Sequence, residues 1–473
     1  MIFNSLTFLL FLSSVVLLYW NLPRQPRLLL IFISSLIFYG FWKFEFIFVM
    51  LFSVVVDFFL AKKIYVTKNI KFLYLSIFIN LSLLFYFKYL IFFANSSIGF
   101  LNLFGLEVDL IFLKIILPLG ISFYTFQTIS YVVDVYRGFI KPEKNFLLYS
   151  SYVIFFPQLI AGPILRASEV IHQLRDRSVF SLSQFSNGLR RIIYGLFLKV
   201  VLADNISTFV DSGFNIPIED IGAWDVLTLS FLFGFQIYFD FSAYSHIAIG
   251  AALLMGITFP ENFNFPYSAT SPRDFWKRWH ISLSSWIRDY LYLPLTGSSV
   301  VNRSTGGIVE KTPKNSDRAL FYSWAIMGLW HGANWTFVLW GLYHAFFVFL
   351  QRILTSSKSI IFKNRIITFI GTLITLPIMM LGWIPFRSEN LETALMMWGK
   401  LFSLNNYLFL SMRENVYLVT FCLLMCFYLI YFIKEKLSKL MIVKNSEIFV
   451  LSVMLVLIFI FLRPIDQFIY FQF

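Results

Sequence analysis

The residues best suited to chemistry surround a histidine within a long uncharged run. His331 lies in the sequence WHGANW (residues 330–335), and no Asp, Glu, Lys or Arg occurs from residue 319 to residue 350. Such a run exceeds the ~20 apolar residues that cross a bilayer, and an ionisable side chain at membrane depth indicates a functional site. Gly328 and Gly332 flank the histidine, so a helix would loosen there, which a membrane tolerates only where the backbone lines a cavity. We therefore predict that His331 faces a buried polar chamber.

A low-dielectric chamber determines what this histidine can do. Burial disfavours imidazolium, and a neutral imidazole accepts a proton from a hydroxyl group, which is the general-base step of acyl transfer. The alternative is a structural histidine bonded to a neighbouring helix, but ionisable groups at this depth are usually functional. His344 would face away from His331 if the helix continued, so a metal pair is not expected. The sequence also lacks a phosphate-binding loop, an H-E-x-x-H motif and a G-x-S-x-G motif.

A second histidine, His280, lies in the densest polar region, residues 258–318. The pattern from Ser271 to Tyr290 predicts one amphipathic helix, with Ser271 as N-cap and Pro272 at the first helical position. Its tryptophans and basic residues are typical of a helix at the membrane interface, where the tryptophans act as anchors. For His280, structural and functional interpretations are equally open. The serines that follow it are interpreted as residues of the polar face.

Two further polar residues lie in apolar surroundings. Asp240 lies within an expected span, residues 225–256, and requires a partner. Gln158 lies in residues 155–166, where two prolines and a glycine predict a broken or re-entrant segment that lines a cavity.

The composition indicates a multi-span α-helical membrane protein. Hydrophobic residues make up 59% of the 473 residues and charged residues 13%, against about 25% charged residues in soluble domains. The net charge of +13 comes from short basic clusters between apolar runs, which is the positive-inside pattern and not a nucleic-acid-binding surface. This pattern predicts an extracytoplasmic N-terminus. Cys422 and Cys426 are interpreted as packing residues, with neither a metal site nor a disulfide framework.

Periodicity and basic clusters give the expected membrane segments. Besides the run that carries His331, we expect spans near residues 4–20, 28–42, 44–60, 72–94, 108–133, 191–204, 225–256, 366–384, 416–433 and 447–462. The first run lacks the features of a cleaved signal peptide and is expected to be a permanent span. Pro118 and Gly120 are expected to kink the span at 108–133, and a short helix is expected at 390–403.

Several blocks together resemble the membrane-bound O-acyltransferases (MBOAT). They are PQLIAGPILR, FDFSAYSHIAIGAALLMGITFPENFNFPYSATSPRDFWKRWHISLSSWIRDYLYLPL, GLWHGANWTFVLWGLYH and GWIPFR. The resemblance covers about residues 118–387 and is to the bacterial branch of alginate and peptidoglycan O-acetyltransferases, with the teichoic acid D-alanyltransferases more distant. It implies an all-α polytopic fold of roughly 11–13 transmembrane or re-entrant helices around a central funnel, formed by one membrane-embedded domain over residues 1–473.

The resemblance also implies a site. His331 matches the catalytic histidine of the family and His280 its second histidine. The implied candidates for the substrate and donor channel are Trp330, Asn334, Trp279, Trp286, Arg288, Asp289, Gln158 and Asp240. No metal and no bound cofactor is expected. Acetyl-CoA, or another acyl-CoA, serves as the cytoplasmic donor.

The implied reaction is acyl transfer across the bacterial cytoplasmic (inner) membrane. The acceptor is a hydroxyl group of an envelope or secreted polysaccharide, or an extracytoplasmic partner protein that completes the transfer. His246 stands where the family pattern has an acidic residue, which leaves the polymer open. Two alternatives are a proton-coupled transporter or flippase that uses Asp240, Asp134 and the histidines, and a family member that acts on a lipid, a teichoic acid or a protein.

Overall fold

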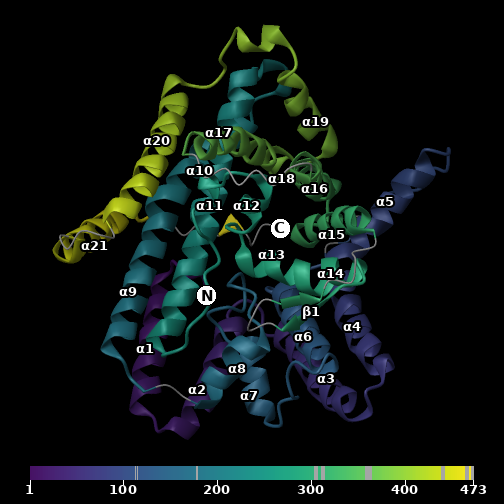
Figure 1. Cartoon of the computed structure of the whole chain (residues 1–473), viewed down its shortest axis with the longest axis vertical. Coiled ribbons are helices and arrows are strands. Elements are labelled where there is room, and N and C mark those ends of the chain that lie inside the picture. The colour runs from purple at the N-terminus through teal and green to yellow at the C-terminus, as the bar shows by residue number, and fades with distance from the viewer. Residues whose placement is uncertain are drawn as a thin grey trace. The chain divides into compact units, whose positions relative to one another are not determined.

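The computed structural model describes residues 1–111, 113, 115–176, 179–302, 307–309, 315–356, 365–437, 443–463 and 468–469. Almost all regular secondary structure of the described residues is helical (Figure 1). One short antiparallel pair, β1 (Ser299–Asn302) and β2 (Gly307–Val309), accompanies the helices, with Ser299 opposite Val309. The protein is an all-α polytopic membrane protein, as the composition predicted.

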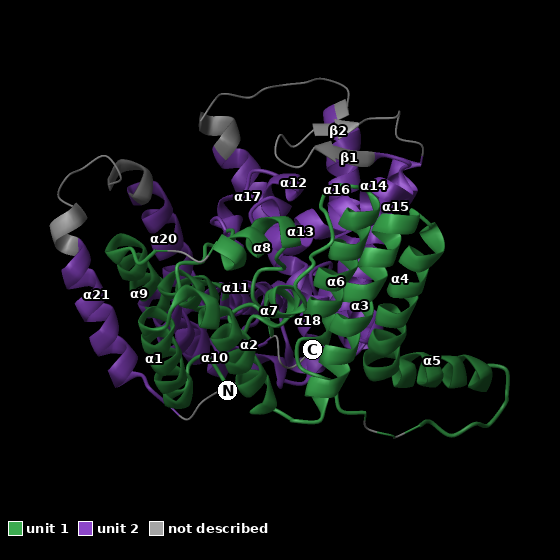
Figure 2. Ribbon diagram, turned by 90° about the horizontal axis from the view of Figure 1, so that it is seen from below, with its two compact units in different colours: residues 1–192, 245–260 green, residues 193–244, 261–473 purple. Residues whose placement is uncertain are grey.

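Two compact units make up the chain (Figure 2). Unit 1 comprises residues 1–192 and 245–260, and unit 2 comprises residues 193–244 and 261–473. The units are not consecutive pieces of the sequence, because residues 245–260 belong to unit 1, and helices α9 and α11 each contribute residues to both units. The expectation of one domain over residues 1–473 stays a prediction.

Unit 1 is built from the N-terminal helices. They are α1 (Leu6–Asn21), α2 (Arg24–Gly40), α3 (Phe46–Thr67), α4 (Ile70–Leu84), the π-helix η1 (Phe85–Tyr89), α5 (Leu90–Asn102), α6 (Ile121–Tyr136), α7 (Phe146–Ile154), α8 (Ala167–Asp176) and most of α9 (Leu182–Phe197).

Unit 2 holds most of α11 (Ala223–Leu254) and the helices that follow it. Before α11 come η2 (Leu198–Ala203), α10 (Asp204–Phe214) and η3 (Ile218–Asp220), and after it η4 (Pro266–Ser268), α12 (Pro272–Trp276), α13 (Ile281–Ile287), η5 (Arg288–Tyr292), α14 (Leu293–Leu295), α15 (Ser316–His331), α16 (Trp335–Ser356), α17 (Arg365–Leu381), α18 (Trp383–Arg387), α19 (Leu391–Lys400), η6 (Leu404–Tyr407), α20 (Glu414–Leu437) and α21 (Val443–Ile460).

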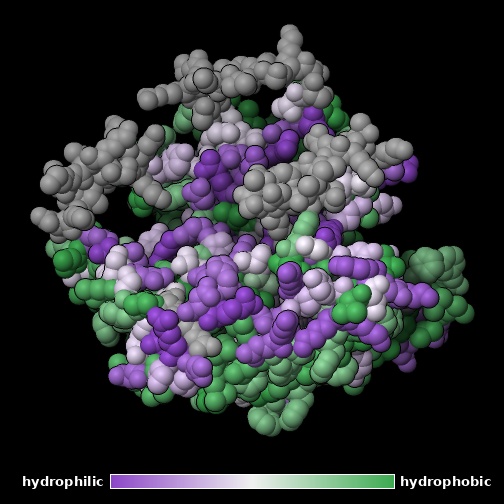
Figure 3. Space-filling model, turned by 60° about the horizontal axis from the view of Figure 1, so that its bottom comes forward, coloured by the Kyte–Doolittle hydropathy of each residue, from purple (hydrophilic) through white to green (hydrophobic). Residues whose placement is uncertain are grey.

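Six helical stretches among the described residues are long and apolar enough to cross a membrane. They are Ile70–Asn102, Leu182–Phe214, Ala223–Leu254, Trp335–Thr355, Phe369–Arg387 and Glu414–Ile433. Their surroundings differ: in the most apolar window of each, 78% of α11 but only 17% of α20 is buried within the protein. A helix that is apolar all round and not covered by protein requires lipid, and hydrophobic residues accordingly reach the outer surface (Figure 3).

One of the expected spans differs from the structure. The expected span at 108–133 is helical only from Ile121, because Gly120 adopts the left-handed conformation (φ 73°) at the N-cap of α6, so the Pro118–Gly120 region precedes the helix and does not kink it. The chain before Gly120 is bonded to α5. The Asn95 side chain makes two hydrogen bonds with the backbone of Ile111, and the Asn102 side chain makes two with the backbone of Val108. The run at 319–350 forms two helices, α15 and α16, as the loosening predicted beside His331 requires.

Other expectations are confirmed. Residues 155–166 form a non-helical connection between α7 and α8, and the short helix expected at 390–403 is α19.

Polar side chains also join α3, α4 and α6 in unit 1. Asp57 accepts hydrogen bonds from Ser76 Oγ (2.5 Å) and Asn80 Nδ2 (2.8 Å), and Asn80 in turn accepts one from Thr128. Such bonds between buried helices stabilise membrane bundles.

Candidate active site in unit 2

A helical hairpin positions His331. The histidine is the last residue of α15, and Gly332 continues in extended conformation (φ −158°, ψ 150°) toward α16. The two helices pack so closely that a Cβ atom on Gly332 would lie 2.0 Å from the Phe337 ring, and one on Gly328 would lie 2.1 Å from the Phe337 carbonyl oxygen. The glycines therefore allow the close approach, and the predicted break beside His331 is confirmed.

His331 lines a small cavity. Its other walls are side chains of α11, α16, α18 and the turn after α12, namely Ile237, Phe241, Trp279, Trp340, Trp383 and Phe386. The volume of about 10 Å³ is close to the minimum for one water molecule. The expectation of a polar chamber is wrong in this respect, because aromatic rings form most of the wall; a neutral imidazole tolerates such surroundings far better than a charged group does.

Three rings hold the His331 imidazole edge-on. Their centroids lie 4.9 Å (Trp330), 5.0 Å (Trp340) and 5.4 Å (Phe386) from that of the imidazole, with interplanar angles of 68–82°. Only 7% of His331 is exposed. Edge-to-face packing of this kind restricts the ring orientation, so the imidazole is presented to the cavity in a defined position.

His280 lies at a sharp turn and not within a helix. The predicted single helix from Ser271 to Tyr290 is wrong: α12 ends at Trp276, and His280 adopts the left-handed conformation (φ 42°) before α13. The backbone around His280 forms hydrogen bonds with the loop before α12 and does not continue the helix. Ile281 N donates to Asn262 O (3.0 Å), and Asn264 N donates to Arg278 O (2.9 Å). The predicted start is confirmed, because Ser271 Oγ caps the Asp274 amide and Pro272 opens the helix.

The polar contacts of His280 are local. Its Nδ1 lies 3.2 Å from Asn262 Oδ1, which also accepts from the Ser282 amide (3.2 Å) and hydroxyl (2.9 Å). Because that oxygen is an acceptor, Nδ1 carries the proton in this arrangement. Burial lowers the pKa of His280 from 6.5 to about 3, so the ring is neutral at physiological pH.

The two histidines share aromatic neighbours. The His280 ring lies 6.3 Å from Trp330, which packs on His331, and 4.7 Å from Phe241, which lines the His331 cavity. Trp330 and Phe241 therefore connect the two sequence-predicted histidines.

The other candidates next to these histidines take different positions. Trp279 (3% exposed) lines the cavity and packs on Trp383 (4.8 Å), whereas Trp286 (6% exposed) packs on Tyr290 (5.1 Å). Both tryptophans are buried in protein, so their interpretation as membrane-interface anchors is wrong. The break in the helix turns them inward.

Asn334, Arg288 and Asp289 make backbone or ion-pair contacts. Asn334 Oδ1 accepts from the Thr336 amide (3.0 Å) at the start of α16, and its Nδ2 donates to the Glu389 carbonyl oxygen (2.9 Å). Asn334 thus ties the turn after His331 to the α18–α19 connection. Arg288 Nε donates to the buried Asp289 carboxylate (2.7 Å) on η5.

Asp240 has the partner that its setting required. Lys199 Nζ lies 2.7 Å from both Asp240 Oδ1 and Asp204 Oδ1, and the Ile469 amide donates to Asp240 Oδ2 (2.8 Å). Asp240 does not line the His331 cavity. Gln158 lies in unit 1, where its Nε2 donates to the Tyr152 carbonyl oxygen (2.5 Å).

Residues that the sequence reasoning missed complete the site. Trp383 and Phe386 belong to the GWIPFR block, and Trp340 to the block that carries His331, so their motifs were visible but their inward orientation was not. Neither Asn262 nor Lys199 belongs to a periodic pattern or a motif that the sequence analysis used. Both act across long sequence separations, on Ser282 and Asp240 respectively.

Comparison with known proteins identifies the family. The sequence model described as "MBOAT, membrane-bound O-acyltransferase family" matches residues 141–386. A "probable alginate O-acetylase AlgI" from Pseudomonas putida is 36% identical over 86% of this chain and 81% of its own length. The peptidoglycan O-acetyltransferase of Helicobacter pylori is 37% identical over 79% of this chain and 73% of its own. The teichoic acid D-alanyltransferase of Bacillus subtilis is 29% identical over 48% of this chain and 57% of its own length. The chain belongs to the membrane-bound O-acyltransferase family.

Proposed function

We propose that this acyltransferase takes acetyl from acetyl-CoA on the cytoplasmic side and delivers it across the membrane for O-acetylation of an envelope or secreted polysaccharide. The similarity to an alginate O-acetylase and a peptidoglycan O-acetyltransferase over most of the chain supports this substrate class. The final acceptor is the polymer itself or an extracytoplasmic partner protein. The basic clusters support a location in the bacterial inner membrane with the N-terminus outside.

The observation that carries the mechanism is the enclosed imidazole of His331 in its aromatic cavity. In the proposed step His331 takes the proton of the acceptor hydroxyl while the hydroxyl oxygen attacks the thioester carbonyl. The new C–O bond forms, the C–S bond breaks, and the proton passes to the departing CoA sulfur. General-base catalysis of this kind contributes about 10²–10⁴-fold to the rate.

His280 is proposed as the second histidine of the site. Its neutral ring, anchored to Asn262 and packed against Trp330 and Phe241, supports a role in holding the walls around His331 or in relaying a proton. Trp279 then forms part of the channel surface, Trp330 packs against both histidines, and Asn334 keeps the turn after His331 in place.

The experiment measures alkali-labile acetate in the envelope polysaccharide of three strains: wild type, a gene deletion, and the deletion complemented with His331→Ala. We expect acetate to fall in the deletion and to stay low with His331→Ala, although that variant reaches the membrane at the wild-type level. Acetate that is unchanged in the deletion would contradict the substrate class. Full restoration by His331→Ala would contradict the proposed base.

The purified protein separates transfer from transport. An acyltransferase releases CoA from acetyl-CoA, whereas a proton-coupled carrier does not. Asp240, which suggested a carrier, is paired with Lys199 in the structure, and this pairing supports a structural role for the intramembrane charge.

A further inference from the structure

The proposed transfer step places negative charge on the acyl carbonyl oxygen. As the acceptor hydroxyl oxygen bonds to the thioester carbon, the π-electron pair of the C=O bond moves onto that oxygen. Hydrogen-bond donors held at this position, an oxyanion hole, usually make the largest single contribution to such a reaction. His331 takes the hydroxyl proton in the proposed step, so the donor to the carbonyl oxygen is a different group.

The walls of the His331 cavity contain few side-chain donors. The side chains of Ile237, Phe241 and Phe386 have none. Besides His331, the donors are indole N–H groups, which donate a hydrogen bond and cannot accept one. They belong to Trp279, Trp340 and Trp383. An oxyanion hole formed by the side chains of this cavity therefore consists of indole N–H groups.

Trp340 has the indole that best matches this role. Its ring packs edge to face on His331, with the two centroids 5.0 Å apart. It is 1% exposed, and its Nε1–H has no acceptor among the residues that the structure describes. A buried donor without an acceptor destabilises a fold and is rare in native proteins, so its presence requires an explanation. A substrate oxygen beside His331 provides one.

Neighbouring rings fix the position of Trp340. Its centroid lies 5.1 Å from that of His344, 5.2 Å from Phe386 and 5.6 Å from Trp276, besides the contact with His331. A donor contributes most to the rate when it is held in place before the charge develops, because no energy is then spent on reorienting it. The packing of Trp340 meets this condition.

His344 lies on the same indole as His331, because the hairpin breaks the helix between the two histidines. It is fully buried, and neither of its ring nitrogens has a partner among the described residues. A Cβ atom on Gly382 would lie 2.7 Å from His344 Nε2, so the imidazole packs against the start of α18. A hydrogen bond from Trp340 to His344 is the structural alternative for this N–H, and measurements of stability distinguish the two roles.

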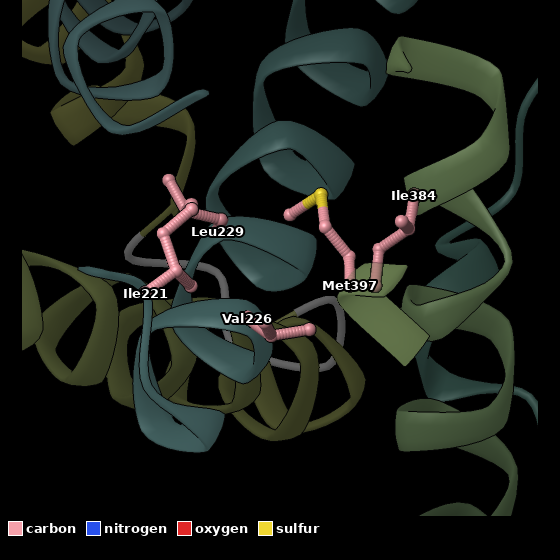
Figure 4. Close-up of a cluster of buried hydrophobic side chains, with 5 residues drawn as sticks. All are labelled: Ile221, Val226, Leu229, Ile384 and Met397. Carbon is pink, nitrogen blue, oxygen red and sulfur yellow. The ribbon is translucent and has the colours of Figure 1, made fainter. Parts of the chain in front are cut away.

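Helix α18 supports the indole from a second direction. Its Phe386 packs on both Trp340 and His331. Its Ile384 is buried in a cluster that includes residues of α11 and α19 (Figure 4). The other members of this cluster are Ile221, Val226, Leu229 and Met397. The cluster therefore anchors the short helix that holds Phe386 against the indole.

We propose that the indole N–H of Trp340 forms the oxyanion hole of this acyltransferase. It donates a hydrogen bond to the thioester carbonyl oxygen as the negative charge develops, and it keeps its own proton. When the electron pair returns to form the C=O bond again, the C–S bond breaks, and His331 delivers the hydroxyl proton to the departing CoA sulfur. This assignment rests on the proposed transfer from acyl-CoA and is independent of the polymer that accepts the acyl group.

Replacement of one ring atom tests the assignment. Benzothienylalanine at position 340 keeps the bicyclic ring of Trp340 and has sulfur in place of the N–H group. We expect kcat for CoA release from acetyl-CoA by the purified protein to fall about 10²-fold. KM should stay unchanged, because the hydrogen bond is made in the transition state. The thermal unfolding midpoint should stay the same or rise, because a buried donor without an acceptor is removed.

The matched control is the same replacement at Trp276. This tryptophan is also buried, its N–H has no acceptor among the described residues, and it packs on Trp340. It is not one of the residues that line the His331 cavity. The variant at position 276 should therefore release CoA at the wild-type rate. Trp340→Phe and Trp276→Phe repeat the comparison with natural side chains.

The outcomes separate this assignment from the proposed function. Wild-type kcat in the variant at position 340, or an equal loss in both variants, would overturn the assignment. A lower unfolding midpoint together with lost activity would also overturn it, because the N–H would then serve a structural bond such as one to His344. If the wild-type protein releases no CoA from acetyl-CoA, the proposed function itself fails.

Discussion

Helix α11 presents two contrasting environments within one turn. Asp240 meets Lys199 in a buried ion pair and accepts a further bond from the Ile469 amide. Phe241 and Ile237 instead face the His331 cavity, where aromatic rings enclose the imidazole. A buried charge must be compensated, whereas a neutral imidazole can be enclosed by rings and still exchange a proton. The contrast separates a polar group that supports the fold from one available for chemistry.

Replacing His331 should give the largest effect in this comparison. We expect His331→Gln to lower kcat for CoA release by about 10²–10⁴-fold, because the amide cannot take up a proton, while the thermal unfolding midpoint in detergent stays close to that of the wild type. The measurement combines CoA release with a melting curve. If the variant loses stability in parallel with activity, His331 supports the fold, as Asp240 does, and is not the catalytic base.

Removing the cation of the ion pair should lower the free energy of unfolding, the quantity that the His331 replacement leaves close to the wild-type value. Lys199→Met removes the cation from beside the buried carboxylate of Asp240, and breaking a buried pair in this way costs about 3–5 kcal/mol. Denaturant titration of the purified protein measures the loss. The double variant Lys199→Met/Asp240→Leu serves as the control and should recover most of it. Equal destabilisation of both variants would argue against the pair as the cause.

The sequence predicted the parts of this contrast that depend on neighbouring residues. The break at Gly332, the cap at Ser271 and the need of Asp240 for a partner follow from local chemistry. The identity of that partner, and the turn at His280, depend on Lys199 and on the backbone of Asn262, which the fold brings in from distant positions. The walls of the cavity come from three helices and a turn, so no local pattern reveals them.

Disturbing the close approach of α15 and α16 should have a smaller effect on stability. In Gly332→Ala the new methyl group would overlap the Phe337 ring, and overpacking of this kind costs about 1–3 kcal/mol; the displaced hairpin should also lower CoA release. In α19, Gly399→Ala is the matched control, because its Cβ would meet nothing within 4 Å. This control should be neutral or stabilising by up to about 1 kcal/mol. If the two variants melt alike, the hairpin is more adaptable than its geometry indicates.

The smallest effect concerns the pH dependence of stability at His280. Its pKa is lowered by burial from 6.5 to about 3 in the folded protein. Between these values the unfolded chain binds a proton at this position that the folded chain does not, so stability is retained above pH 6.5 and falls as the pH decreases toward 3. The slope from this residue is at most about 1.4 kcal/mol per pH unit. His280→Asn removes the titrating group and keeps a residue that tolerates the left-handed backbone, so unfolding measured at pH 7 and pH 5.5 should show a smaller difference than in the wild type. His172→Asn changes an exposed histidine and should retain the wild-type difference. An unchanged difference in His280→Asn would mean that His280 takes up a proton in the folded protein, and would remove the basis for treating it as the neutral member of the histidine pair.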